Sequence, residues 1–454
     1  DDAMPQRTGL TPADGLFCLL NDLRTAQPVQ IWSESASGTD FLVLRYEGED
    51  EDGTVEKQVW LTEQGMQPAY AELYADGSRV LTIRVTAWQE RKMEPNKHRI
   101  WAEVDLDAIE HNYRVICAQA ESPVLCVVKA DAYGHGAVPV ARRLQATGAP
   151  YFAAATVPEA VELREGGITK PILILGYVDT ADMDTIARYH ITAPVYDRET
   201  AQLLSEAAAR TGEQITVHYK LDTGMTRLGF PPWERAQTVQ DILDCAALPG
   251  LRSEGIFTHF AVSDVPAGET YTELQYQRFA GVCGDLRQRG LDLPLRHCAN
   301  SGGIQFYKNM HCTMTRAGII LYGYRPDASV PPVLDLRPAM TVKARVVQVR
   351  DIPEHTTVSY GRTYETDRPT RMAVVSIGYA DGYLRTGSGR AHMLINGQRV
   401  PVLGRICIDM CMVQLPEDAA VHRGDEVTVF GPAGWTAEDV AEEEGTISYE
   451  VVCA

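Results

Sequence analysis

A lysine at the end of an apolar run is the first residue suited to chemistry. Residues 124–136 read VLCVVKADAYGHG, so Lys129 follows five apolar residues and precedes a small, polar turn that contains Tyr133. A lysine in this position often only brings its ammonium group to water. If it is buried, its pKa falls below the solution value of about 10.4, and the neutral amine can attack a carbonyl group.

Other reactive side chains occur at similar places, where apolar runs end. His259 lies in THF, Ser301 opens the Ser-Gly-Gly run after Asn300, and Arg316 lies in TRAGI. Each residue also has a purely structural explanation. His259 would be a hydrogen-bonded core histidine, Ser301 part of a turn, and Arg316 a cation at a strand edge. A Ser-Gly-Gly run that begins a short helix also suits a phosphate, because free backbone N–H groups point at the anion.

The elements that must position these residues alternate in type between about residues 99 and 330. Short apolar strands are followed by amphipathic helices, and the strands are expected to end near Lys129, Ala155, Gly176, Tyr196, Asp222, His259, Asn300 and Tyr322. Eight such units predict an α/β fold with a closed (β/α)8 TIM-type barrel, with an open doubly wound sheet as the alternative. In a barrel, the carboxyl ends of the strands share one rim, so the reactive residues would meet there. A buried lysine beside a phosphate cradle suggests a Schiff base to pyridoxal 5′-phosphate.

β-rich segments lie on both sides of this region. Residues 15–90 alternate apolar and polar side chains between turn signals, which predicts an antiparallel meander, with a linker over residues 89–98. From about residue 335 the chain is β-rich again, and Asn396-Gly397 indicates a hairpin. We therefore expect a small antiparallel β extension over residues 1–92, the barrel over 93–333 and a C-terminal β domain over 334–454.

Composition narrows the class of protein. The chain has 454 residues, 45% hydrophobic and 23% charged, with a net charge of −19. That charge argues against nucleic acid or an anionic membrane surface as a partner. No apolar run approaches the roughly 20 residues that span a bilayer, and the first residues lack the features of a signal peptide. The ten cysteines form no CxxC pair, so we expect reduced thiols, no metal site and a cytoplasmic protein.

Nine sequence blocks together resemble the alanine racemase family, which is pyridoxal-phosphate-dependent and of fold type III. They are collinear between about Trp101 and Cys453 and read VVKADAYGHG, KLDTGMTRLGF, FTHFAVSD, HCANSGGI, TRAGIILYGYRP, VSYGRTY, SIGYADGY, VPVLGRICIDM and TISYEVVC. The resemblance implies the barrel, the C-terminal β domain, a homodimer with shared active sites and the interconversion of L- and D-alanine. The first 92 residues have no counterpart in the family.

The resemblance also implies which residues are catalytic. Lys129 would hold the cofactor and act as one acid/base, and Tyr360 of the second subunit would act on the opposite face. His259 would hydrogen-bond that tyrosine, with Arg316 beyond it and facing the pyridine nitrogen. Two groups are needed because racemisation removes a proton from one face of Cα and returns it on the other.

The remaining matched positions would bind cofactor or substrate. The phosphate would rest against Tyr133, Ser301, the backbone of Gly318 and Ile319, and Tyr449. Arg227 would lie near the substrate carboxylate, Tyr379 would line the substrate path, and Lys220 matches a lysine that some members carbamylate. Ile408 stands where the family usually has methionine, so its side chain would alter the small substrate pocket.

Several functions remain open at this point. The family implies D-alanine supply for peptidoglycan. Serine or broader amino-acid specificity is the first alternative, because of Ile408. A non-catalytic pyridoxal-phosphate-binding barrel would lack the β domain that carries Tyr360. A decarboxylase would be expected to have an acid where this chain has Arg316. In a further alternative, the N-terminal meander is a binding module and the barrel is inactive.

Overall fold

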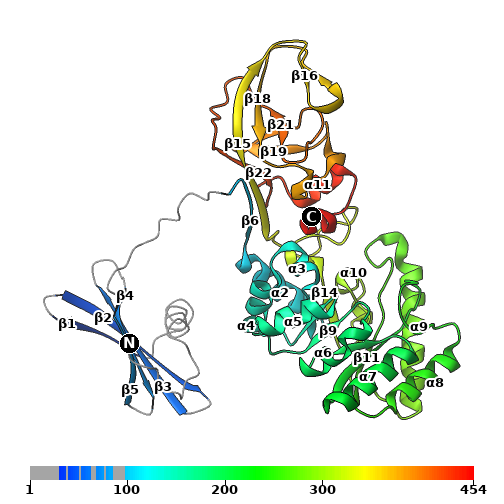
Figure 1. Cartoon of the computed structure of the whole chain (residues 1–454). Coiled ribbons are helices and arrows are strands. Elements are labelled where there is room, and N and C mark those ends of the chain that lie inside the picture. Colours follow the sequence, from blue (N-terminus) through cyan, green and yellow to red (C-terminus); the bar gives the residue numbers. More distant parts are fainter. Residues whose placement is uncertain (1–29, 37–38, 51–52, 63–67, 76–77, 85–97) are drawn as a thin grey trace. The chain divides into compact units, whose positions relative to one another are not determined.

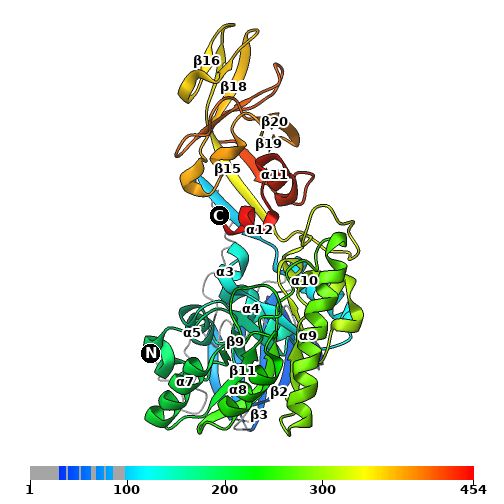
Figure 2. The same cartoon turned by 90° about the vertical axis from the view of Figure 1, so that its right-hand side faces the viewer.

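The computed structural model describes residues 30–36, 39–50, 53–62, 68–75, 78–84 and 98–454. The chain divides into two compact units, Asp1–Lys97 and His98–Ala454. In the second unit, Figures 1 and 2 show a region of alternating strands and helices joined to a β-rich domain. Among the helices of the described ranges, none is long and apolar enough to cross a bilayer.

The first unit contains the predicted meander. Its five strands are hydrogen-bonded in chain order: β1 (Gln30–Ala36), β2 (Thr39–Asp50), β3 (Gly53–Thr62), β4 (Pro68–Ala75) and β5 (Ser78–Arg84). Every neighbouring pair is antiparallel, as period-two alternation predicts. Residues 85–97, which hold the expected end of the last strand and most of the expected linker, lie outside the described ranges.

The second unit begins with a barrel of parallel strands. They are β7 (Val124–Val127), β8 (Tyr151–Ala154), β9 (Ile172–Ile174), β10 (Ala193–Val195), β11 (Ile215–Lys220), β12 (Leu251–Phe257), β13 (Leu295–His297) and β14 (Thr315–Ala317). They form two four-stranded sheets. A parallel bridge between Leu173 and Thr192 joins the sheets on one side. On the other side, the N–H of Arg316 donates to the carbonyl of Ala299 at 3.0 Å. The barrel is therefore closed, as expected.

Helices alternate with these strands and cover the barrel. They include α2 (Leu106–Gln119), α4 (Ala137–Thr147), α5 (Val157–Glu165), α6 (Met183–Arg188), α7 (Arg198–Thr211), α8 (Arg235–Ala246), α9 (Glu269–Gln288) and α10 (Ser301–Phe306). In α7 the Asp197 side chain accepts from the N–H of Thr200, and Gly212 ends the helix in a left-handed conformation. Both are common helix-end signals. β7 and β8 are buried at every residue, because helices cover them on one side and the barrel interior lies on the other.

The expected end of the eighth strand was wrong. The strand β14 ends at Ala317, and residues Ile319–Tyr322 form a 3₁₀ helix, η4, instead of a strand ending near Tyr322. All four residues of η4 are buried. Their apolar character therefore reflects packing in the core rather than strand geometry.

The C-terminal domain is built on an antiparallel sheet in the order β20-β19-β22-β15-β18-β21. Its strands are β15 (Met340–Ile352), β18 (Thr370–Val375), β19 (His392–Ile395), β20 (Gln398–Pro401), β21 (Cys411–Gln414) and β22 (Glu426–Phe430), with a small β16 (Thr357–Val358) and β17 (Tyr364–Glu365) pair and the helices α11 (Ala437–Glu444) and α12 (Ser448–Cys453). The predicted hairpin is confirmed: β19 pairs with β20 across Asn396 and Gly397, which both have positive φ.

One further strand of this sheet precedes the barrel in the chain. β6 (Ile100–Val104) pairs antiparallel with β15, and Val104 lies opposite Met340. The N–H of Asp105 then donates to the carbonyl of Ala339 at 2.8 Å. The chain therefore passes through the C-terminal sheet before it enters the barrel.

Candidate functional site

Lys129 lies at the carboxyl end of β7 and begins an unusual turn. The four residues that follow, Ala130 to Tyr133, have φ values of 50–55° and ψ values of 43–53°, so they form a left-handed helical turn. Such a turn is rare for residues other than glycine and costs roughly 1–2 kcal/mol per residue. This conformation places the side chains of Lys129 and Tyr133 on the same cavity.

Hydrogen bonds from backbone N–H groups to two carboxylates hold this turn. The Asp131 side chain accepts from the N–H of Ala137 at 2.6 Å. Glu159, on α5, accepts from the N–H of Ala130 at 3.0 Å and from the N–H of Ala155 at 2.7 Å. Because Ala155 follows β8, the second bond ties the turn to the neighbouring strand.

The environment of Lys129 favours its neutral amine. Burial lowers the pKa of Lys129, and the positive charge of Arg227 lowers it further. A partly buried amine of this kind is a better nucleophile and base at neutral pH than a solvated lysine. The position agrees with the expectation that the lysine is not merely a strand cap.

A cavity of about 150 Å³ opens in front of Lys129 at the rim of the barrel. Of the residues predicted for the site, it is lined by Lys129, Tyr133, His259, Ser301, Arg316, Gly318, Ile319 and Tyr449. Seven of these come from the barrel, whereas Tyr449 comes from α12 of the C-terminal domain. Asp264, Asn300 and Leu175 also line the cavity.

One wall of the cavity is shaped to hold an anion. The Ser301 hydroxyl accepts from the N–H of Gly318 at 3.0 Å. A Cβ atom on Gly318 would lie 2.8 Å from the Tyr133 hydroxyl oxygen, so only glycine fits there. Ser301 and Ile319 begin α10 and η4, and first-turn N–H groups have no partner within their own helix. Burial raises the pKa of Tyr133, which keeps its hydroxyl as a neutral donor.

Arg316 lies at the base of the cavity and is almost fully buried. Its guanidinium donates to the carbonyls of Thr258, His297 and Cys298 at 2.7–3.0 Å. It also lies 3.3 Å from Nδ1 of His259. Burial lowers the pKa of Arg316 to about 10, so the group stays protonated at neutral pH.

Lys220 and Arg227 lie at the end of β11 and on the loop that follows. Nζ of the buried Lys220 donates to the carbonyl of Leu175 at 3.1 Å. Burial, with help from Arg227, lowers the pKa of Lys220 to about 8. The Asp222 carboxylate accepts from the N–H groups of Thr226 and Arg227 at 2.8 and 2.7 Å. Arg227 itself is exposed and does not line the cavity.

The other three predicted residues lie together on the C-terminal domain. Tyr360, Tyr379 and Ile408 are 66%, 42% and 49% exposed, and none of them lines the cavity of the same chain. The loops of Tyr379 and Ile408 are joined, because the N–H groups of Tyr379 and Ala380 donate to the carbonyls of Cys407 and Ile408 at 3.0 Å. Ser359, next to Tyr360, donates through its hydroxyl to the carbonyl of Arg405 in the same loop as Ile408. Tyr360 is the second residue after β16, which lies at the end of the domain remote from the barrel in Figures 1 and 2.

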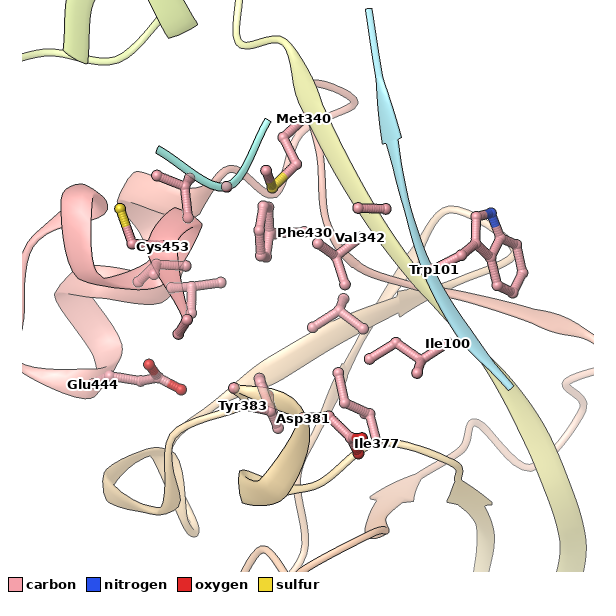
Figure 3. A pocket seen from close by; sticks show the side chains of 18 residues that line it. Ile100, Trp101, Met340, Val342, Ile377, Asp381, Tyr383, Phe430, Glu444 and Cys453 are labelled. Atoms are coloured by element: carbon pink, nitrogen blue, oxygen red, sulfur yellow. The ribbon is translucent and has the colours of Figure 1, made fainter. Parts of the chain in front are cut away.

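A second cavity of about 280 Å³ lies between β6, β15 and the two C-terminal helices. Figure 3 shows its mostly apolar lining, with the Glu444 carboxyl on one side. Burial raises the pKa of Glu444 to about 7, and its Oε1 atom has no hydrogen-bond partner among the described residues. Nothing in the lining resembles the anion wall of the first cavity.

Comparison with known proteins identifies the family. The family model "Alanine racemase, N-terminal domain" matches residues 104–326, and "Alanine racemase, C-terminal domain" matches residues 339–454. An alanine racemase of Desulfovibrio desulfuricans is 44% identical over 356 residues, which cover 78% of this chain and 95% of that protein. The chain belongs to the alanine racemase family.

Solved structures of alanine racemases agree with this assignment. One from Clostridium difficile 630 has a TM-score of 0.76 and 40% identity, and the match covers 79% of this chain and 94% of that one. One from Streptomyces lavendulae, a D-cycloserine producer, has a TM-score of 0.76 and 36% identity, with 79% and 95% covered. Both family models begin after residue 97, so the N-terminal unit lies outside the alanine racemase match.

Several polar residues behind the site were not predicted from the sequence. Glu159 holds the turn after Lys129. The buried His218 and His297 and the partly buried Glu254 form a hydrogen-bonded cluster with Arg316. His218 and His297 each lie in a predicted strand, and a histidine inside an apolar strand is itself a signal. Their partners could not be identified, because the partners lie on different strands.

Proposed function

We propose that this protein is a pyridoxal-phosphate-dependent racemase that interconverts L- and D-alanine. The main support is that Lys129, with its lowered pKa, lines the same cavity as the anion wall of Tyr133, Ser301 and Gly318. The residues present fit the cofactor. The amine of Lys129 would bind it covalently, and the anion wall, with Tyr449 and the N–H of Ile319, would hold its phosphate.

When bound, the cofactor withdraws electrons from the substrate and weakens the bond between Cα and its hydrogen. The protein must then supply two proton-transfer groups on opposite faces of Cα. We assign Nζ of Lys129 to one face and the hydroxyl of Tyr360 to the other. Because Tyr360 is two-thirds exposed and remote from the cavity of its own chain, we assign the second role to Tyr360 of the partner subunit. The active unit is thus proposed to be a homodimer.

His259 is proposed to donate a hydrogen bond to Tyr360 of the partner subunit, and the hydrogen-bond directions around its ring support this role. A guanidinium only donates, so the contact between Arg316 and Nδ1 of His259 requires an unprotonated Nδ1. Burial, together with the charge of Arg316, lowers the pKa of His259 and keeps its ring neutral. The proton therefore resides on Nε2. A donor at that atom would stabilise the phenolate form of Tyr360 of the partner subunit. The tyrosine could then accept and return a proton more readily at neutral pH.

Arg316 would limit side reactions. Its protonated guanidinium would face the pyridine nitrogen and leave that nitrogen without a proton, which weakens the electron sink. A carboxylate at this place would strengthen the sink and favour reactions such as transamination. We therefore assign Arg316 to reaction specificity.

Substrate binding is assigned to three exposed residues. Arg227 would lie near the substrate carboxylate, and Ile408 and Tyr379 of the partner subunit would shape the pocket and its access path. We place the end of the N-terminal unit near residue 97 and the end of the barrel near residue 333, and we assign residues 100–104 to the C-terminal β domain. We propose a cytoplasmic role in D-alanine supply for peptidoglycan. Ile408 favours serine or broader specificity as the second candidate.

The test is to incubate the cofactor-loaded protein separately with L-alanine, L-serine and L-lysine and to measure each D-isomer by chiral chromatography. We expect D-alanine to form fastest and Lys129→Ala to form none. Faster formation of D-serine would change the substrate assignment. Failure to form any D-isomer would refute the racemase proposal.

A further inference from the structure

A chain of hydrogen bonds runs from Arg316 through the interior of the barrel. Nη1 of Arg316 lies 3.0 Å from Nδ1 of His297. Nε2 of His297 lies 3.0 Å from Nδ1 of His218. Nε2 of His218 lies 3.1 Å from Oε2 of Glu254. Both histidine rings are fully buried, so four side chains from four strands form one unbroken path, called here the Glu254 relay.

The direction of every bond in the relay follows from one fact. Arg316 can only donate, so Nδ1 of His297 must accept and the proton of its neutral ring must be on Nε2. That proton points at Nδ1 of His218, which places the second ring's proton on its own Nε2, facing the carboxylate of Glu254. Burial lowers the pKa of both histidines and keeps both rings neutral.

The far end of the relay is an ionised carboxylate. The hydrogen bond from His218 is the main cause that lowers the pKa of Glu254 to about 2. The hydroxyl of Tyr151, on β8, also donates to Oε2 at 2.9 Å. Arg252 pairs with Oε1 at 3.0 Å and is half-exposed, so the relay ends near the surface at the amino-terminal side of the barrel.

The relay compensates the positive charge of Arg316, whose direct hydrogen-bond acceptors are all neutral. Within residues 98–454, no carboxylate forms an ion pair with Arg316, although this guanidinium is buried. A buried cation without compensation is costly. The two rings transmit part of the compensation, because each turns its lone pair toward Arg316 and its N–H toward Glu254.

We propose that Glu254 is a positioning residue that acts on Arg316 through His218 and His297, and thereby sets the electrostatics beneath the cofactor. The inference rests on the proposed function, since it concerns the cofactor that Lys129 and Arg316 would hold. Glu254 does not line the cavity that would hold the cofactor and substrate. It fixes the orientation of the guanidinium and the tautomers of both rings from the opposite side of the barrel.

The decisive variant is Glu254→Gln in the cofactor-loaded enzyme. The amide still accepts a hydrogen bond but carries no negative charge, so the site beneath the cofactor becomes more positive. Protonated forms of the bound cofactor are then disfavoured. We expect the pH midpoint of its absorption change to fall by about 0.3–1 unit, which is a two- to tenfold change in the equilibrium. We also expect kcat to fall by a similar factor, with little change in KM.

The interpretation of that midpoint depends on the groups around Arg316. The titratable side chains that interact with it are His259, His297, Lys220, Cys298 and Cys312. None of these is altered in Glu254→Gln. A shift that appears in this variant therefore reports the charge at the end of the relay.

Two further variants separate the relay from a purely structural role. His218→Phe breaks the relay, and the double variant with Glu254→Gln should shift the midpoint no more than the larger single change. Additive shifts would overturn the relay. If His218→Phe does not fold, Tyr151→Phe removes one donor from Glu254 but not its negative charge. The carboxylate then accepts more strongly from His218, so the midpoint should shift in the opposite direction, by a smaller amount than in Glu254→Gln. A role in folding alone would lower the melting temperature and leave the midpoint unchanged.

The matched control is Glu165→Gln. Glu165 also accepts from a tyrosine hydroxyl, that of Tyr189 at 3.2 Å, but it is exposed and has no path to Arg316. Its substitution should leave the midpoint and kcat unchanged. A folded Glu254→Gln enzyme that matches this control would overturn the inference. A wild-type protein that binds no cofactor or forms no D-amino acid would instead overturn the proposed function.

Discussion

Gly134 and Val452 approach each other so closely that a Cβ atom on Gly134 would lie 2.1 Å from the carbonyl oxygen of Val452. The first residue belongs to the left-handed turn after Lys129, and the second belongs to α12, which carries Tyr449. This contact places a residue of the C-terminal domain on the wall of the barrel cavity. The site therefore depends on how tightly these two segments pack.

Gly134→Ala should weaken both folding and cofactor binding. The new methyl group meets a backbone oxygen and the φ of +78° disfavours alanine, so we expect the free energy of unfolding to fall by about 2–4 kcal/mol. Displacement of α12 should also raise the Kd for pyridoxal phosphate. Gly212→Ala is the control, because its φ is +75° and no atom lies within 4 Å of the added Cβ. It should cost only about 1 kcal/mol. Equal losses for the two variants would show that the Val452 contact is unimportant.

A hybrid dimer tests the shared site. Lys129→Ala and Tyr360→Phe subunits should each form a poorly active homodimer. If each site combines Lys129 of one subunit with Tyr360 of the partner subunit, a purified hybrid has one intact site and one doubly defective site. Co-expression with two affinity tags yields the hybrid, which should show about half of the wild-type activity. A hybrid with only the residual activity of its parents would place both groups in the same subunit.

Glu444→Gln should stabilise the protein at alkaline pH. Burial, with the nearby charges of Glu450 and Glu443, raises the pKa of Glu444 from 4.5 to about 7. The folded carboxyl therefore binds its proton more tightly than the unfolded one. Its contribution to stability is greatest below pH 4.5, falls as the pH rises toward 7 and stays low above that. We expect unfolding at pH 8 to cost about 1–2 kcal/mol more in the variant, and no difference at pH 4.

Urea unfolding at both pH values measures this effect. Glu442→Gln is the control, because Glu442 is exposed on the same helix. A gain of equal size at pH 4 and pH 8, or an equal gain in the control, would contradict the assignment to the buried carboxyl.

Because the turn after Lys129 is left-handed, an alanine-to-glycine substitution there should stabilise the protein, whereas in a right-handed helix it destabilises. Ala130 has φ 51° and ψ 53°, where glycine is favoured over alanine, and its side chain is exposed. Ala130→Gly should therefore raise the free energy of unfolding by up to about 1 kcal/mol. Ala209→Gly, at an exposed site in the right-handed helix α7, should lower it by about 1 kcal/mol. Thermal unfolding of both variants is sufficient, and changes of the same sign would refute the turn.

The barrel could be predicted because its strands are buried on both faces. VLCV and YFAA are apolar at every position, and helical segments with end signals separate them. The same reasoning failed for residues 319–322, because apolar composition alone does not distinguish a buried strand from a buried 3₁₀ turn. The C-terminal helix that carries Tyr449 was likewise not predicted, although Tyr449 itself was found by resemblance.

The Glu254 relay could not be predicted from the sequence, for a geometric reason. The register between β11 and β12 shifts between Val217 and His218, which brings His218 opposite Gly255. A Cβ atom at Gly255 would lie 2.7 Å from the His218 ring, so the missing side chain makes room for it. Neither the register shift nor this fit can be read from residue types along the chain.

The pairing of β6 with β15 makes the barrel an insertion within the C-terminal domain. The chain leaves that domain at Val104 and returns at Met340, and these residues are antiparallel neighbours. A turn of about two to four residues could therefore join them as a hairpin and leave the β domain as a separate, shorter protein. By the same connectivity, the N-terminal unit is fused to the domain that carries Tyr360, and a truncated chain that begins after residue 104 would lack one strand of that domain's sheet.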